Sequence, residues 1–334
     1  MVSFDLSFKD IILRVHCEQQ QEYIIKEHML GHAEICEPVG KPTYCLVSTS
    51  NPIKTSGIYI KFIDKWFDNA ELDCWINNRE KTCYISSIKA NNITNANLLL
   101  QYFTSNLFAR LLEIKGYIAL HSSCATKDNK GISFIAPRNS GKTNCLINLM
   151  EAGFDSVTNE KLAIKYENGN FIGHSIAQDV SIRMSKEFRD QPSHKKYVFI
   201  AKKMGIKLYD KNKLEGNNIH IGSVKLAKMN RVKQIPSTIV TNFFVPEYIP
   251  GLKTVHFENL SSKHFLQTLI TQHLPMVHDT TSFFSLIDIK EDALFNSHET
   301  LLKIAEHGAM TCKQSEFTKE SFIKGIHNIL ELKK

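Results

Sequence analysis

The chain contains 334 residues, of which 43% are hydrophobic and 22% charged, and its formal net charge is +7. These values are ordinary for a globular protein, and the length allows two domains with a sizeable core. No run of 18 apolar residues occurs, and the first ten residues lack the basic start and apolar block of a signal peptide. The eight cysteines are scattered without a Cys-x-x-Cys pair, which favours reduced thiols and a cytoplasmic protein.

The first hundred residues predict short strands and one helix. Apolar or alternating segments indicate strands at residues 11–16, 44–48 and 57–61. Residues 95–115 predict a long amphipathic helix, because Leu98, Tyr102 and Leu111 fall near one face. We place a domain boundary near residue 90. Residues 1–90 would form a smaller α+β domain suited to substrate selection, and residues 91–334 the nucleotide-binding catalytic domain.

One segment has the pattern of a phosphate-binding P-loop, with alanine where the first glycine usually stands. Its residues are Ala136, Pro137, Arg138, Asn139, Ser140, Gly141, Lys142 and Thr143. An apolar strand at 131–136 precedes it, and a helix pattern at 143–152 follows it and ends at Gly153. Strand, loop, Gly-Lys-Thr and helix is the order that phosphate binding requires.

Each part of this segment has a chemical role if it binds a nucleotide. Backbone N–H groups of the loop and of the helix start, up to Asn144, would face the phosphates. The Lys142 ammonium would face solvent and neutralise the β- and γ-phosphates, while the Thr143 hydroxyl is placed for Mg²⁺. The sequence therefore predicts ATP or GTP as the nucleotide and Mg²⁺ as its metal.

The surrounding segments carry a resemblance to a known family. A Leu-His-Ser-Ser strand lies within residues 117–125, and an Asn-Gly pair in residues 166–170 predicts a hairpin. With the turn ending in Gly131, the P-loop and the acidic strand end after Gly153, this order resembles the HPr kinase/phosphorylase-like kinases. It is more distantly similar to phosphoenolpyruvate carboxykinases.

The clear match covers about residues 115–185. A weaker one continues through a strand at 236–245 and a Leu-Ser helix start at 260–269. The resemblance implies an α/β fold, in which a P-loop kinase core with a mixed sheet, like the C-terminal domain of HPr kinase, follows the smaller α+β domain.

The resemblance also implies acidic residues after the P-loop helix, one acting as the base and one near the metal. That pair falls on Asn159 and Glu160, so the first carboxylate is absent here. Glu160 would act as the base or hold Mg²⁺, and Asp155 is the alternative if the register is shifted. His121 matches the strand histidine beside the phosphates, and Arg183 stands where the family carries a basic residue near them.

Residues 183–233 form a basic block, with 14 Lys and Arg against 4 Asp and Glu. A block of this kind would attract ATP together with an acidic peptide, or RNA. The alternative is a solvated insertion without a binding role. Few aromatic residues are interleaved and no RNA-recognition motif occurs, so nucleic-acid binding is disfavoured.

These observations together predict an ATP-dependent, Mg²⁺-assisted kinase that transfers the γ-phosphoryl group to a hydroxyl. Lys142, Glu160 and His121 are the expected catalytic residues. The favoured acceptor is a serine of a protein or modified peptide; a small-molecule hydroxyl acceptor and a nucleotide-gated binding protein with weak hydrolysis stay open. Helices expected at 299–306 and 317–331 pack on the sheet or on a partner subunit, which leaves a homo-oligomer open.

Overall fold

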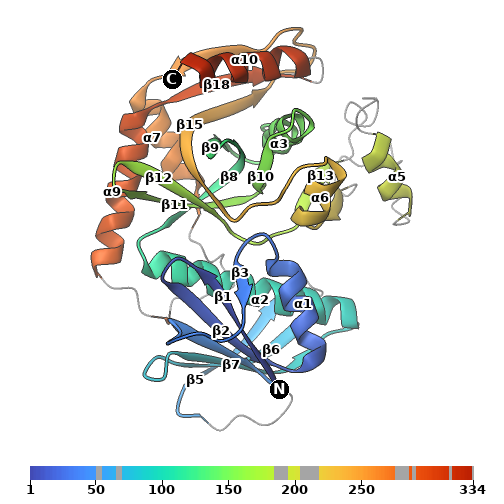
Figure 1. The fold of residues 1–334 in the computed structure, drawn as a ribbon, viewed down its shortest axis with the longest axis vertical. Coiled ribbons are helices and arrows are strands. Elements are labelled where there is room, and N and C mark those ends of the chain that lie inside the picture. Colours follow the sequence, from blue (N-terminus) through green and yellow to red (C-terminus); the bar gives the residue numbers. More distant parts are fainter. Residues whose placement is uncertain are drawn as a thin grey trace.

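The structure is a computed structural model, and it describes residues 1–49, 55–64, 70–183, 195–203, 218–274, 286–287, 291–315 and 318–332. These residues form two mixed sheets with helices packed against them (Figure 1). The predicted α/β class with a mixed sheet is therefore confirmed.

The N-terminal sheet contains seven strands in the order β3-β1-β2-β4-β7-β6-β5. The strands are β1 (Val2–Phe8), β2 (Ile11–Cys17), β3 (Glu34–Cys36), β4 (Tyr44–Ser48), β5 (Ile58–Asp64), β6 (Ala70–Asn77) and β7 (Thr82–Lys89). β4 runs parallel to β2 and β7, and the other pairs are antiparallel. Alternate residues of β2 are buried, as expected for a sheet with one covered face.

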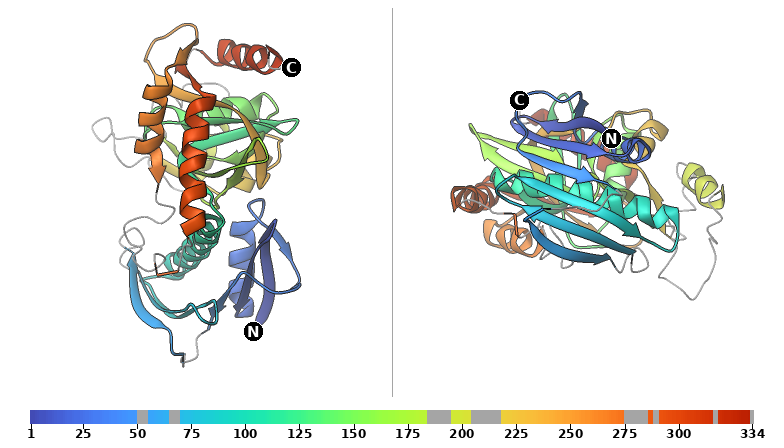
Figure 2. Two further views of the ribbon diagram at one scale, coloured as in Figure 1. Left: turned by 90° about the vertical axis from the view of Figure 1, so that its left-hand side faces the viewer. Right: turned by 90° about the horizontal axis from the view of Figure 1, so that it is seen from below.

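Two helices, α1 (Gln19–Met29) and α2 (Ile93–Ile114), pack against this sheet and each other. The hydrophobic core that they share with the sheet extends into the second half of the chain, where it includes Ala119, Ala163 and Ile176. In Figures 1 and 2, α2 lies between the two sheets. The division at residue 90 stays a prediction, and the observed packing joins both sides of it.

The second sheet contains nine strands, with the order β10-β8-β11-β12-β15-β18-β16 and with β9 and β17 paired beside β8. The strands are β8 (Ile118–Lys127), β9 (Lys130–Ile135), β10 (Asp155–Thr158), β11 (Lys161–Glu167), β12 (Asn170–Ser175), β15 (Ser237–Tyr248), β16 (His256–Leu260), β17 (His273–Leu274) and β18 (Ala309–Gln314). β15 runs parallel to β9 and β18, and the other pairs are antiparallel.

Helices cover both faces of this second sheet. One core lies under α3 (Lys142–Glu151), α6 (Ser223–Met229) and α10 (Lys319–Leu332). The other lies under α7 (Ser262–Gln272) and α9 (Glu291–His307), which Figure 2 shows side by side across the sheet. A separate pair, β13 (Val180–Arg183) with β14 (Asn218–Ile221), and α5 (Lys195–Lys203) complete the described elements.

Several local predictions are confirmed in this fold. The strand before the loop is β9, the helix after it is α3, and the hairpin between β11 and β12 turns at Asn168 and Gly169, with φ of 51° and 79°. Positive φ at both turn residues is the geometry that an Asn-Gly pair favours. Among the described residues, no helix combines the length and apolar character needed to cross a membrane.

Candidate functional site

The loop over residues 136–141, called here the 136–141 loop, leaves the end of β9 and enters α3 directly. Ala136 is buried, and the chain then becomes exposed from Pro137 to Asn139. Asn139 and Gly141 have left-handed backbones, with φ of 70° and 92°. Successive turns of this kind point N–H groups into a concavity, and the positive end of the α3 dipole adds to its preference for anions.

The Lys142 side chain folds back over this loop. Its Nζ donates hydrogen bonds to the carbonyl oxygens of Ala136 (2.7 Å) and Pro137 (2.8 Å), and the residue is 6% exposed. The expectation that Lys142 faces solvent is therefore wrong, because the loop carbonyls bind the ammonium. Burial lowers the pKa of Lys142 to about 8, while the Glu160 carboxylate acts in the opposite direction.

Contacts from outside the loop fix its geometry. The fully buried Gln314 of β18 donates to the Gly141 carbonyl (3.2 Å) and accepts from the Asn144 side chain (3.2 Å). A Cβ on Gly141 would lie 2.6 Å from Gln314 Nε2, so this approach requires glycine. Ser123 of β8 donates to the Lys142 carbonyl at 3.1 Å. The loop is thus held by residues of two strands, β18 and β8, that do not pair with each other.

Glu160 lies between two polar side chains immediately before β11. His121 Nε2 is 3.1 Å from Glu160 Oε2, and Asn159 Nδ2 donates to Glu160 Oε1 at 3.2 Å. His121 Nδ1 in turn faces the Gln272 side-chain oxygen at 3.3 Å. The Glu160 side chain keeps 24% exposure, so both of its oxygens are oriented while the group still reaches solvent.

Strand register decides between Glu160 and Asp155. Lys161 lies directly opposite His121 across β11 and β8, whereas Asp155 lies opposite Thr126 at the far end of β8. Five residues along a strand separate these positions by about 16 Å. The structure therefore brings Glu160 and His121 together near Lys142 and leaves Asp155 apart, where it accepts from the Lys233 backbone (2.8 Å).

The remaining predicted site residues differ in their exposure and contacts, and some lie outside the described residues. Thr143 and Asn144 are half-exposed in the first turn of α3, and Arg138 is exposed on the loop. Ser140 donates to the Pro137 carbonyl at 2.7 Å. Arg183 ends β13, and its side chain lies outside the described residues, as do residues 184–194 and 204–217 of the basic block.

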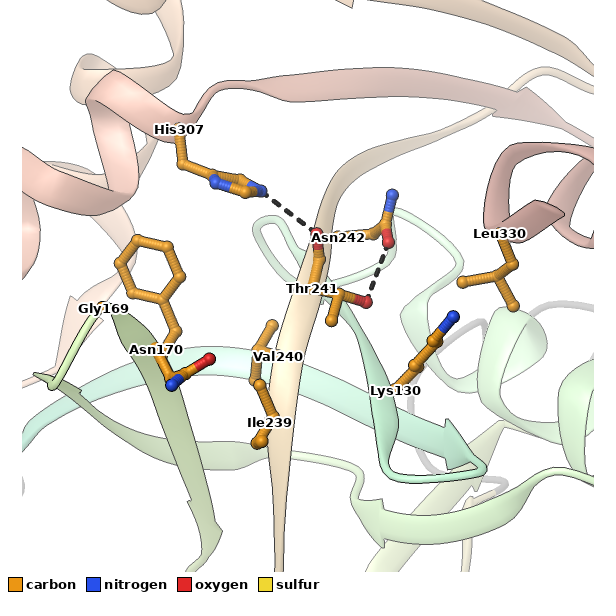
Figure 3. Close-up of a pocket in the computed structure, with 10 residues that line it drawn as sticks. Lys130, Gly169, Asn170, Ile239, Val240, Thr241, Asn242, His307 and Leu330 are labelled. Carbon is orange, nitrogen blue, oxygen red and sulfur yellow. Dashed lines mark hydrogen bonds between the residues drawn. The ribbon is translucent and has the colours of Figure 1, made fainter. Parts of the chain in front are cut away.

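A cavity of about 260 Å³ lies elsewhere on the molecule (Figure 3). Lys130, Thr241 and His307 line it, and His307 Nε2 donates to the Thr241 carbonyl at 3.1 Å. Lys130 begins β9, whereas the 136–141 loop follows the end of that strand. The two places are about 20 Å apart along the strand, so this cavity is not part of the candidate site.

Two residues of the site were not predicted from the sequence. Lys161 is 5% exposed, and burial lowers its pKa to about 8 while Glu160 opposes that shift. Its position directly after Glu160 was the one available signal. Gln314 is 173 residues from Gly141 in the chain, and no local pattern marks it.

Comparison with known proteins adds one distant likeness. No family model matches the chain, and no curated protein matches it either. Among solved structures, the chain is similar to the Hpr(Ser) kinase/phosphatase from Coxiella burnetii, over 43% of this chain and 77% of that chain. The sequence identity is 15% and the TM-score 0.25. A likeness at this level carries no argument about activity, and the family assignment stays a prediction.

Proposed function

We propose that this protein is a P-loop kinase that transfers the γ-phosphoryl group of ATP or GTP to a hydroxyl group with the help of Mg²⁺. The observation that carries the proposal is the meeting of the P-loop lysine with two residues that the resemblance implied. The Lys142 ammonium lies over the 136–141 loop, its charge interacts with Glu160, and Glu160 is hydrogen-bonded to His121. Phosphoryl transfer requires a cation for the phosphates beside a group that orients the acceptor.

The chain's own residues account for the proposed steps. Loop N–H groups and Lys142 would bind the β- and γ-phosphates and neutralise charge as it develops. The acceptor hydroxyl would give its proton to Glu160 as its oxygen bonds to the γ-phosphorus. The bond from that phosphorus to the β–γ bridging oxygen breaks, and the nucleoside diphosphate leaves with the electron pair. His121 and Asn159 would hold the carboxylate in position for the proton.

The residues present also fit a magnesium ion bound together with a nucleotide. Mg²⁺ prefers oxygen ligands and is commonly held by one or two carboxylates, substrate phosphates and water. Thr143 and Glu160 offer such oxygens, and Asn159 Oδ1 is buried without a hydrogen-bond partner among the described residues. When bound, the metal would neutralise phosphate charge. No cluster of three His, Cys, Asp or Glu in the described part of the chain could hold a metal alone.

The acceptor that we favour is a serine of a protein or modified peptide. A small-molecule hydroxyl uses the same chemistry, so the test must include both classes. Incubation with Mg²⁺ and ATP, followed by mass spectrometry of candidate acceptors, should reveal one phosphoryl group on the true acceptor.

Lys142→Ala is the matching variant for this test. A hydrogen bond to a charged group is worth about 1.5–3 kcal/mol, so ATP affinity should fall at least about tenfold and acceptor labelling should be lost. Lys165→Met, in the same sheet, removes one positive charge away from the loop and should leave both unchanged. Undiminished ATP binding and turnover in Lys142→Ala would overturn the proposal.

One observation supports a second candidate, a nucleotide-gated binding protein. Asn159 occupies a position where the resemblance implies a carboxylate, and its amide cannot take a proton at neutral pH. Such a protein would bind ATP with an affinity that depends on Lys142 and yet leave every acceptor unlabelled.

A further inference from the structure

Lys161 is a largely buried lysine that is paired with none of the described residues. The residue is 5% exposed, and its ammonium forms no hydrogen bond or ion pair with any described residue. An uncompensated charge inside a protein is costly, so buried lysines are usually paired. Lys142 makes the comparison clear, because the residue is just as buried, at 6% exposure, and two carbonyl oxygens accept from its ammonium.

The Lys161 side chain lies on the same sheet face as the candidate site. Residues directly opposite in neighbouring strands point to the same side, and Lys161 is opposite His121. Two residues further along β8, Ser123 points to that face as well and donates to the first residue of α3. Lys161 therefore shares the face with His121, Glu160 and the start of α3.

Among the described residues, the charges gathered there do not balance. Lys142 and Lys161 are both buried, and the Glu160 carboxylate interacts with both. Glu160 has its two oxygens turned to His121 and Asn159. Two ammonium groups facing one carboxylate leave an excess of positive charge beside the concave 136–141 loop. An anion at this place would complete the balance and accept hydrogen bonds from Lys161.

We propose that Lys161 is a second phosphate-binding cation of this site, and that it contacts an oxyanion held between the 136–141 loop and Glu160. This inference rests on the proposed function and deepens it. A nucleotide would be bound by lysines from two different elements, with Lys142 at the start of α3 on the loop side and Lys161 at the start of β11 on the sheet side. An ordinary structural lysine would instead have a partner within the protein.

Calorimetry with inorganic pyrophosphate in the presence of a metal chelator tests this inference without enzymatic turnover. We compare the whole chain with Lys161→Met, Lys161→Arg and Lys165→Met. Lys165 lies on the same strand and the same face, and it is paired with Glu167 (3.3 Å), so its variant controls for net charge. Lys161→Met should weaken pyrophosphate binding at least about tenfold, the loss expected for one charged hydrogen bond. Lys161→Arg should retain most of the affinity, and Lys165→Met should match the parent.

Urea unfolding of the same proteins separates binding from a structural role. Methionine keeps the length of the side chain without its charge, so Lys161→Met should unfold at the same or a higher urea concentration than the parent. A clearly lower midpoint would make Lys161 a structural residue and overturn the inference.

The binding measurements separate a failure of this inference from a failure of the proposed function. The inference fails alone if the parent binds pyrophosphate and Lys161→Met binds it within about twofold, or if Lys165→Met loses as much affinity. A parent chain that binds neither pyrophosphate nor ATP overturns the proposed function together with the inference.

Discussion

Two buried histidines should make this protein sensitive to mild acid. His32 is 2% exposed, and its ring nitrogens lie 2.9 Å from the Ser175 hydroxyl and 2.6 Å from the Ser223 hydroxyl. His174 is fully buried against Phe8, with ring centroids 3.8 Å apart. Neither His174 nitrogen has a partner of good geometry among the described residues, although the His32 backbone lies near the ring. Burial lowers the pKa of both to about 3.

The sign of the effect follows from where each state binds protons. Unfolded histidines bind a proton below about pH 6.5, whereas these two stay neutral in the fold until about pH 3. Their contribution to stability is therefore full above pH 6.5 and is lost progressively as the pH falls toward 3. At pH 5 each histidine should lower the free energy of unfolding by about 2 kcal/mol relative to pH 8, and the two together by about 4 kcal/mol.

Urea unfolding followed by circular dichroism at pH 7.5 and pH 5 measures this loss. His174→Leu should reduce the difference in unfolding free energy between the two pH values by about 2 kcal/mol. At pH 7.5 it should not destabilise, because leucine has a similar volume and removes two unpaired nitrogens, each costing about 1–3 kcal/mol. His264→Gln, at an exposed histidine, is the control and should keep the full difference. The reasoning would be refuted if the parent had the same urea midpoint at both pH values. It would also be refuted if His174→Leu showed the same difference in stability between the two pH values as the parent.

Two further predictions concern the candidate site itself. Glu160→Gln should lower the rate of phosphoryl transfer by at least about 100-fold with a smaller change in nucleotide affinity, because it removes the base. Asp155→Asn should keep normal turnover. If steady-state kinetics show the reverse pattern, the base is Asp155. Gly141→Ala should lower the free energy of unfolding by about 1–2 kcal/mol or more, because alanine tolerates the φ of 92° poorly and its Cβ would meet Gln314. An unchanged urea midpoint for Gly141→Ala would show that the loop can relax.

The parts of the fold that were predicted correctly depend on neighbours in the chain. The strand before the 136–141 loop and the helix after it follow from apolar patterns of a few residues. The hairpin at Asn168 and Gly169 follows from the backbone preferences of two residues, and both have the positive φ that the turn requires. Ser261, in the Leu-Ser helix start, is the N-cap of α7 and accepts from the His264 N–H. Each of these signals is complete within about ten residues.

The features that escaped prediction depend on contacts between distant segments. The burial of Lys142 requires its own loop to fold back, and the constraint on Gly141 comes from Gln314 at the end of β18. The lack of a partner for Lys161 among the described residues becomes visible only when β11 is placed beside β8. A sequence pattern names the residue types that chemistry needs, but burial and pairing are properties of the assembled sheet.

A single face of β8 connects the N-terminal sheet, the candidate base and the 136–141 loop. Ala119 packs in the core shared with the N-terminal sheet, His121 contacts Glu160, and Ser123 bonds to Lys142. Alternate residues of a strand are about 7 Å apart, so each place is one step from the next. On the paired strand β11, Ala163 lies in the same shared core and Lys161 lies opposite His121. A change in the packing of the N-terminal sheet would therefore reach His121 and Lys161 through two paired strands.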